Sequence, residues 1–331
     1  MRTLVGTKKG QRYDVMLALL ALFVLPIYYY GVRVLIMLAL ALVTAIVVDF
    51  AARKIFKYKP GRRVRYKIDN TSIITAMICT LLLSAAVPYW MVVVTVAIAL
   101  LVGKYPFGGR EHNIFNPAAV GLTFVGLCWP ELVFQYPEPM QAVDLSNRVG
   151  GKLVHSMEYQ LGLGGVPSVD KMDVILGKFA GPMGATLALV LFACGIYLLV
   201  RRTISIHITA SLLITTSLMV VIAPRISSSL KATLGYELVA GVLLFGSVFL
   251  ANDPTTTPTS KLGKVYFGIV LGLLTTIFKY YGVNEYGFLY ALLIANALSS
   301  FCDSLADHTI SLWKRRRTPK KSHPIGEEEK A

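Results

Sequence analysis

Charge is scarce in this sequence: Asp, Glu, Lys and Arg make up 15% of its 331 residues, whereas hydrophobic residues make up 55%. Soluble domains carry charge on about a quarter of their positions, so this composition argues against a soluble fold. Cysteine is also scarce, with 4 residues that stand singly in apolar segments and form no C-x-x-C pair. That spacing argues against a disulfide framework or an iron–sulfur motif and favours small apolar core residues.

The motifs of self-contained enzymes are absent. The chain contains no HExxH, GxSxG, P-loop or GxGxxG pattern, and His112 and His207 have no partners at metal-ligand spacing. The sequence therefore predicts no hydrolase, no ATP-driven pump and no metal site.

Long apolar runs fill the chain instead, and they predict an all-α polytopic membrane protein. At about 20 residues per crossing, there is room for about ten transmembrane helices. They belong to one integral domain, 14–305, between a tail of residues 1–13 and a tail of residues 306–331. One interpretation is an inverted repeat of five plus five spans, which would place a site where the halves meet. The predicted spans are 14–31, 33–50, 71–87, 89–103, 115–129, 174–200, 203–223, 233–250, 264–281 and 286–303.

The positive charge is distributed unevenly along the chain, whose formal net charge is +15. Basic clusters fall on alternate links between the spans, as the positive-inside rule requires, so both termini are predicted to be cytoplasmic. Contact with anionic lipid explains the charge better than nucleic-acid binding does, because no nucleic-acid motif accompanies it. The long link 130–173 is less basic and is predicted to face outward. Its acidic residues are Glu131, Glu138, Asp144, Glu158, Asp170 and Asp173.

The link 104–117 is dense in Gly, Pro and Asn. Gly108 and Gly109 let the backbone approach a ligand closely, and Asn113 and Asn116 offer amide groups that suit the edge of a heterocycle. Pro117 favours the first turn of a helix, whose free amides attract phosphate or an anionic ring. The alternative is a tight turn that caps two helices.

The link 251–261 is rich in hydroxyl groups. Prolines after Asp253 and Thr257 forbid a continuous helix. The hydroxyl groups, including that of Thr255, together with Lys261, would form a polar pocket for a flavin, a phosphate or a cation. The alternative is a cytoplasmic turn with positive-inside lysines.

Three carboxylates lie near the predicted ends of spans: Asp49, Glu237 and Asp303. A carboxylate at membrane depth is a functional candidate, whereas one at a helix end more often acts as a cap. A cap is the favoured interpretation for Asp49 and Asp303, and Glu237 is a candidate for a cation path.

Both polar links resemble motifs of one known family. The run from Gly103 to Gly121 (GKYPFGGREHNIFNPAAVG) is similar to a motif of the D subunit of Rnf complexes and of the B subunit of the sodium-translocating NADH:quinone reductase. The run from Phe249 to Leu274 (FLANDPTTTPTSKLGKVYFGIVLGLL) is similar to a second motif of that family, with Asn252 in place of the usual Thr. The resemblance extends from about residue 12 to residue 305.

The resemblance implies a role in a bacterial or archaeal cytoplasmic membrane. Such subunits hold flavin and pass electrons between partner subunits of a complex that pumps sodium ions or protons. The implied cofactor is FMN, with riboflavin in some members. The implied flavin-lining residues are Gly108, Gly109, Asn113, Asn116, Asp253, Thr255 and Thr257.

One departure from the family concerns the covalent attachment of FMN. Family members esterify FMN to a hydroxyl residue of an S/T-G-A-T motif in the outward link, but residues 130–173 contain no threonine. Aligning Ser146 with the serine of that motif places Val149 at the acceptor position, and valine has no oxygen to esterify. The flavin is therefore predicted to be bound without a covalent bond. The alternative is a flavin-free relative that serves as a small-solute or cation transporter or as a scaffold subunit.

Overall fold

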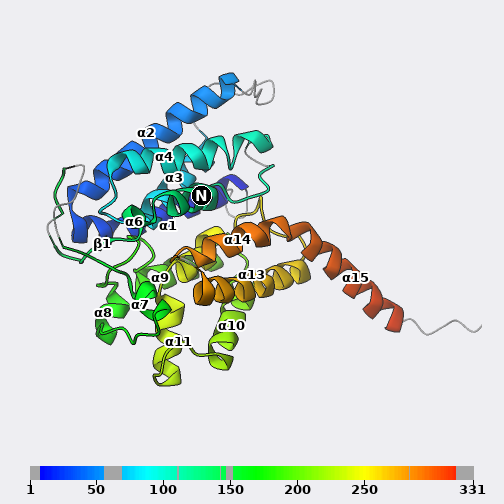
Figure 1. Ribbon diagram of the computed structural model, residues 1–331. Helices are drawn as coiled ribbons and strands as arrows, with labels where there is room; N and C mark the ends of the chain where they lie inside the picture. Colours follow the sequence, from blue (N-terminus) through cyan, green and yellow to red (C-terminus); the bar gives the residue numbers. More distant parts are fainter. Residues whose placement is uncertain are drawn as a thin grey trace, which may run out of the picture.

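The computed structural model describes residues 8–55, 69–109, 112–141, 143–146, 152–282 and 284–317, and these are mostly helical (Figure 1). In this part of the chain the one sheet is a pair of antiparallel two-residue strands, β1 (Tyr136–Pro137) and β2 (Leu153–Val154). The prediction of an all-α membrane protein is confirmed by several long apolar helices.

Helices α1 to α6 form one group, whereas α7 and α8 lie beside α9 and α11 of the second half (Figure 1). α1 and α2 are long, α3, α4 and α5 are shorter, and small helices follow in the link after α5 (Figure 1). The elements are α1 (Lys8–Tyr30), α2 (Val32–Ile55), α3 (Asn70–Leu82), α4 (Tyr89–Leu101), η1 (Tyr105–Phe107), α5 (Pro117–Cys128), α6 (Pro130–Val133), α7 (Met157–Gly162) and α8 (Lys171–Leu176).

The second half packs against the first and ends in a helix that projects from the body, α15 (Figure 1). The elements are α9 (Ala188–Val200), α10 (Ile206–Ile222), α11 (Leu230–Val239), α12 (Leu243–Phe245), the π-helical turn η2 (Gly246–Leu250), α13 (Lys261–Tyr281), α14 (Gly287–Ala297) and α15 (Ser299–Arg317). One continuous hydrophobic core contains residues of both halves. The halves therefore form one packed unit.

Fewer helices reach full membrane length than the sequence predicts. In the described part of the chain, 4 helices are long and apolar enough to cross a membrane: 10–30, 32–52, 89–107 and 261–281. Two bent pairs, α11 with α12–η2 (66°) and α14 with α15 (58°), raise this to 6 if each is one span. α3, α5, α9 and α10 are shorter apolar helices.

Two predicted spans are interrupted by non-helical backbone. The span predicted at 71–87 ends as helix at Leu82, and the span predicted at 174–200 is non-helical between Gly177 and Leu187. Gly177 ends α8 with a φ of 76°, a conformation that favours glycine. The interrupted segments bond to each other, because Gly184 N donates to Leu81 O at 2.6 Å and Met183 N to Leu83 O at 3.3 Å. Paired backbone of this kind is tolerated inside a membrane protein.

α1 connects two opposite ends of the molecule. Near its start, Gln11 Nε2 donates to Arg202 O; at its end, Tyr29 Oη donates to Leu176 O. A helix of 23 residues is about 34 Å long. We name the end at Gln11 the pocket side and the end at Tyr29 the link side, because the link 130–173 lies there.

The first three turns of α15 contact the body, where Thr309 Oγ1 lies 3.2 Å from Tyr266 Oη of α13. The Asp303 carboxylate accepts hydrogen bonds from the backbone amides of Thr259 (2.8 Å) and Ser260 (3.0 Å). Ser260 in turn caps α13 through Gly263 N. Asp303 thus holds the loop that precedes α13, a neighbouring helix, and does not cap α15, the helix to which it belongs.

Arg33, at the start of α2, hydrogen-bonds both to the segment 83–88 between α3 and α4 and to the link 130–173. Its side chain is fully buried and donates to the carbonyl oxygens of Ala85 (2.6 Å), Val87 (2.9 Å), Asp144 (2.9 Å) and Ser146 (2.7 Å). The guanidinium also lies 4.5 Å from the ring centroid of Tyr89. One cation therefore satisfies backbone carbonyls of two segments that are distant in sequence.

Replacing Arg33 with Lys is expected to destabilise the protein by about 3 kcal/mol, since an ammonium cannot reach the same carbonyls and leaves some of them unpaired. Thermal unfolding in nanodiscs measures the change. The control is Arg202→Lys at an exposed arginine, which should leave the unfolding temperature unchanged. Equal stability of the Arg33→Lys variant and the wild type would contradict the role of Arg33.

Candidate functional site

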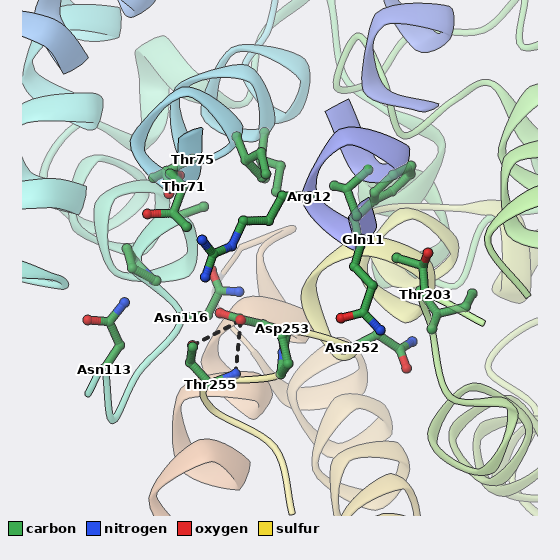
Figure 2. Close-up of a pocket in the computed structure, with 18 of the residues that line it drawn as sticks. Gln11, Arg12, Thr71, Thr75, Asn113, Asn116, Thr203, Asn252, Asp253 and Thr255 are labelled. Carbon is green, nitrogen blue, oxygen red and sulfur yellow. Dashed lines mark hydrogen bonds between the residues drawn. The ribbon is translucent and has the colours of Figure 1, made fainter. Parts of the chain in front are cut away.

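A pocket with a volume of about 240 Å³ opens on the pocket side, between the start of α1 and the two polar links (Figure 2). It lies just below the ~300 Å³ at which ordinary ligand pockets begin. Elements from both halves of the chain contribute to it. Its lining residues are Gln11, Arg12, Val15, Thr71, Ile74, Thr75, Ile78, Lys104, Asn113, Asn116, Pro117, Ala118, Thr203, Ile204, Val248, Phe249, Asn252, Asp253, Pro254 and Thr255.

The first polar link contributes its two asparagines. Asn116 caps α5 by accepting a hydrogen bond from Ala119 N at 3.3 Å, and Pro117 occupies the first helical position, as predicted. With Nδ2 turned toward the preceding turn, Asn113 donates to Lys104 O at 3.2 Å and to Gly109 O at 2.8 Å. Gly108 and Gly109 have φ values of 97° and 82°. They form the turn that positions Asn113 but do not line the pocket.

The second polar link follows the π-helical turn η2. π-Helical turns often occur at functional sites, and here the turn carries Val248 and Phe249 into the pocket wall. Asp253 accepts two hydrogen bonds from Thr255, one from its backbone N at 3.2 Å and one from its hydroxyl at 2.9 Å (Figure 2). Thr257 donates to Asp253 O at 2.9 Å and does not line the pocket.

The first link contacts the last residue of η2, immediately before the second link. Asn116 Nδ2 lies 3.5 Å from Leu250 O, which is a long hydrogen bond, and both links line the same pocket. Asn252, at the position where the family has Thr, is held by three hydrogen bonds: it accepts from Ser205 N (2.9 Å) and donates to Thr209 Oγ1 (2.9 Å) and Ser247 O (2.8 Å). Asn252 therefore joins the second link to the start of α10.

A buried ionic network supports the pocket from the α3 side. Lys104 is 1% exposed, and its Nζ lies 3.0 Å from Asp69 Oδ2 and also contacts Ser72. Ser72 donates to Asp49 Oδ1 at 2.6 Å, and Tyr105 donates to the same oxygen. Asp49 is therefore a buried acceptor between α2, α3 and η1, not a solvated cap. Burial raises the pKa of Asp69, but the charge of Lys104 and hydrogen bonds from Lys104 and Thr71 outweigh burial, so this pKa lies below its usual value.

The polar half of the pocket carries opposite charges. Arg12 extends from α1 toward Asn116 and Asp253 (Figure 2). Burial raises the pKa of Asp253, against the hydrogen bonds from Thr255 and the charge of Arg12, which lower it. This carboxyl is therefore more ready to hold a proton than an exposed aspartate.

The arrangement suits a partly polar ligand. Apolar side chains line part of the wall: Val15, Ile74, Ile78, Val248 and Phe249. Amides, hydroxyls and charges line the rest. A few polar groups in an otherwise apolar pocket fix the orientation of a heterocycle.

Four of the predicted site residues line the pocket: Asn113, Asn116, Asp253 and Thr255. Gly108, Gly109 and Thr257 lie in the flanking turns. Sequence reasoning missed Gln11, Arg12, Thr71, Thr75 and Thr203. Arg12 stands in a basic stretch that also fits the positive-inside rule, so its sequence context gave no signal of a binding role.

Comparisons with known proteins identify the family of the chain. Residues 6–310 match the model of the NQR2, RnfD, RnfE family. A protein of Haemophilus ducreyi, strain 35000HP, named as the D subunit of an ion-translocating oxidoreductase complex, is 27% identical over 89% of this chain and 90% of its own length. Proteins of the same name from Haemophilus influenzae, strain PittEE (26% identical, 89% of this chain, 90% of its own length), and Pectobacterium atrosepticum (27% identical, 85% and 88%) are also similar. The chain belongs to the NQR2, RnfD, RnfE family.

Proposed function

We propose that this protein is the D-type membrane subunit of an Rnf-like ion-translocating oxidoreductase complex and passes electrons through a flavin bound in the pocket. The observation that carries the proposal is that two polar links, more than a hundred residues apart in sequence, line one pocket with amides, hydroxyls and an apolar wall. The names of its relatives support membership of a multi-subunit complex. Electron flow would be coupled to the transport of sodium ions or protons, with partner subunits supplying and removing the electrons.

The residues of the pocket fit the ring system of FMN or riboflavin. The apolar wall, including Ile74 and Phe249, would contact the faces of the ring. The amide of Asn116 and the hydroxyls of Thr71 and Thr75 would meet its polar edge, and Arg12 would balance negative charge. The flavin, when bound, supplies the capacity to take up and release electrons. Asp253, whose pKa is raised by burial, would hold or release a proton at its carboxyl oxygen.

We propose that the flavin is not covalently bound. Val149, the residue aligned with the family's acceptor, lies outside the described residues. Ser146 is held in place by its backbone carbonyl, which Arg33 binds at 2.7 Å. The whole link 130–173 contains no threonine, and its serines, Ser146, Ser156 and Ser168, do not stand at the acceptor position of the family's S/T-G-A-T pattern.

The proposed topology has ten crossings and two inverted halves of five, in a bacterial or archaeal cytoplasmic membrane. The short apolar helices α3, α5, α9 and α10 would complete the set of crossings. Both termini and the pocket would face the cytoplasm, because the basic clusters of the sequence fall on that side. The basic tail would meet anionic lipid there.

Acid precipitation tests the mode of flavin binding. We expect the purified complex to be yellow and its flavin to remain in the supernatant after precipitation, because no covalent bond retains it. If the precipitated protein gave a fluorescent band at the position of this chain on a denaturing gel, non-covalent binding would be disproved. Absence of flavin from both fractions, with all partners present, would disprove the redox role.

The Asn116→Asp variant tests the pocket. Aspartate keeps the helix cap of α5 but removes the amide donor and adds a charge near Asp253. We expect flavin to bind about tenfold more weakly, since one lost hydrogen bond is worth about 1.4 kcal/mol. Titration of the flavin-depleted protein with riboflavin, followed by fluorescence quenching, measures the affinity.

The matched control for that experiment is Thr257→Val. Its hydroxyl lies in the same link but outside the pocket, so flavin affinity should stay at the wild-type value. Loss of binding in Thr257→Val, with full binding in Asn116→Asp, would show that the pocket is not the flavin site.

A further inference from the structure

The link side contains a second buried polar centre, at the opposite end of α13 from the pocket loop. Arg225 and Lys279 each bridge Glu158 and Glu237. Arg225 lies 2.9 Å from Glu158 Oε1 and 2.7 Å from Glu237 Oε1, and Lys279 lies 3.0 Å from Glu158 Oε2 and 3.2 Å from Glu237 Oε2. All four side chains are 7% exposed or less. Two cations and two carboxylates balance, so this cluster is electrically neutral and Glu237 is fully paired.

Glu285 lies beside this cluster and has no such partner. It stands in the turn between α13 and α14 and is 7% exposed. Tyr136 Oη donates to Glu285 Oε2 at 2.8 Å, and Ser156 also hydrogen-bonds to the carboxyl. Oε1 is buried and accepts no hydrogen bond from the described residues. No ion pair between described residues involves Glu285.

The groups that face Glu285 make its charged form unfavourable. Tyr136 belongs to β1, and Ser156 and Glu158 stand at the start of α7. Tyr286 is the residue that precedes α14. Of these only Glu158 carries a charge, and it is negative. The nearby cations Arg225 and Lys279 are already shared between Glu158 and Glu237. An isolated buried carboxylate is so costly that the group binds a proton or another cation instead.

We propose that Glu285 is a proton-binding site on the link side of the protein, which holds one proton at neutral pH and exchanges it with water on that side. Binding forms an O–H bond at Oε1 with a proton taken from water, and release returns the proton to water. The site is separate from the pocket and is expected whether or not flavin binds there.

The pH range of the exchange follows from the surroundings. Burial raises the pKa of Glu285, hydrogen bonds from Ser156 and Tyr136 lower it, and the charge of Glu158 raises it, so that the resulting pKa is about 8. An unfolded glutamate ionises near pH 4.3. Between these values the folded chain binds more protons than the unfolded chain, so this group makes stability fall as the pH rises from about 4.3 to about 8.

Infrared titration of the full-length protein in nanodiscs tests the site. The C=O band of a protonated carboxyl should persist at pH 7 and disappear with a midpoint near pH 8. The band should be absent in Glu285→Gln, which keeps the shape of the protonated side chain. It should be unchanged in Glu131→Gln, at an exposed carboxyl on the same side. An unchanged band in Glu285→Gln, or a midpoint between pH 4 and 5, would overturn the proposal.

A second variant keeps the proposal falsifiable if Glu285→Gln does not fold. Tyr136→Phe removes a hydrogen bond that favours the charged form, so the midpoint should move to higher pH. A downward shift or no shift would overturn the proposed site. The midpoint should also be the same in sodium chloride and in choline chloride at equal ionic strength, and a sodium-dependent midpoint would assign the site to Na⁺ instead of a proton.

Discussion

The structure depends on one constraint: in an apolar environment, backbone N–H and C=O groups that leave a helix must find partners inside the protein. The chain leaves its helices at residues 83–88 and 177–187, and these two breaks bond to each other through Met183 N and Leu83 O. Arg33 satisfies four further carbonyls, two in the first break and two in the link. A cation that has carbonyls and the Tyr89 side chain as partners, and no carboxylate, is costly to bury, yet it satisfies several backbone carbonyls at once. This explains why a fully buried arginine stands at the start of a long apolar helix.

The same constraint creates the pocket. The two polar links are places where helices end, and their free amides and carbonyls are satisfied by side chains such as Asn116, Asn252 and Asp303. Because these side chains hold the backbone of the links, the links leave a shared space that Arg12 of α1 and Thr71 and Thr75 of α3 also line. The sequence leaves two interpretations open for each link, a ligand site or a turn that caps helices. The two are compatible, because different side chains of one link can serve each purpose.

Much of the fold follows from the sequence, but the details of the helices do not. Hydropathy identifies the long helices α1, α2 and α13 with nearly correct bounds, since an apolar run of their length has few other structures available. It fails at Gly177–Leu187, because hydropathy records how apolar a segment is and not whether its backbone has a partner elsewhere. For the site, motif resemblance identifies Asn113, Asn116, Asp253 and Thr255. It misses Arg12 and Thr203, which reach the pocket only through the packing of α1 and the α9–α10 link. The buried carboxyl of Glu285, which has no ion pair among the described residues, is equally hard to predict from sequence, because its burial depends on β1 and α7, far away along the chain.

The attachment of α15 has a mechanical consequence. The Asp303 carboxylate accepts hydrogen bonds from the backbone amides of Thr259 and Ser260, which lie in the same short loop as Asp253 and Thr255. The rest of α15 extends beyond the body as a stiff arm (Figure 1). Asp303 and the contact of Thr309 with Tyr266 both join this arm to α13 and to the loop before it, so a displacement of the arm would act on one rim of the pocket. A neighbour docking on this arm would thus act as a lever on the cavity without touching it.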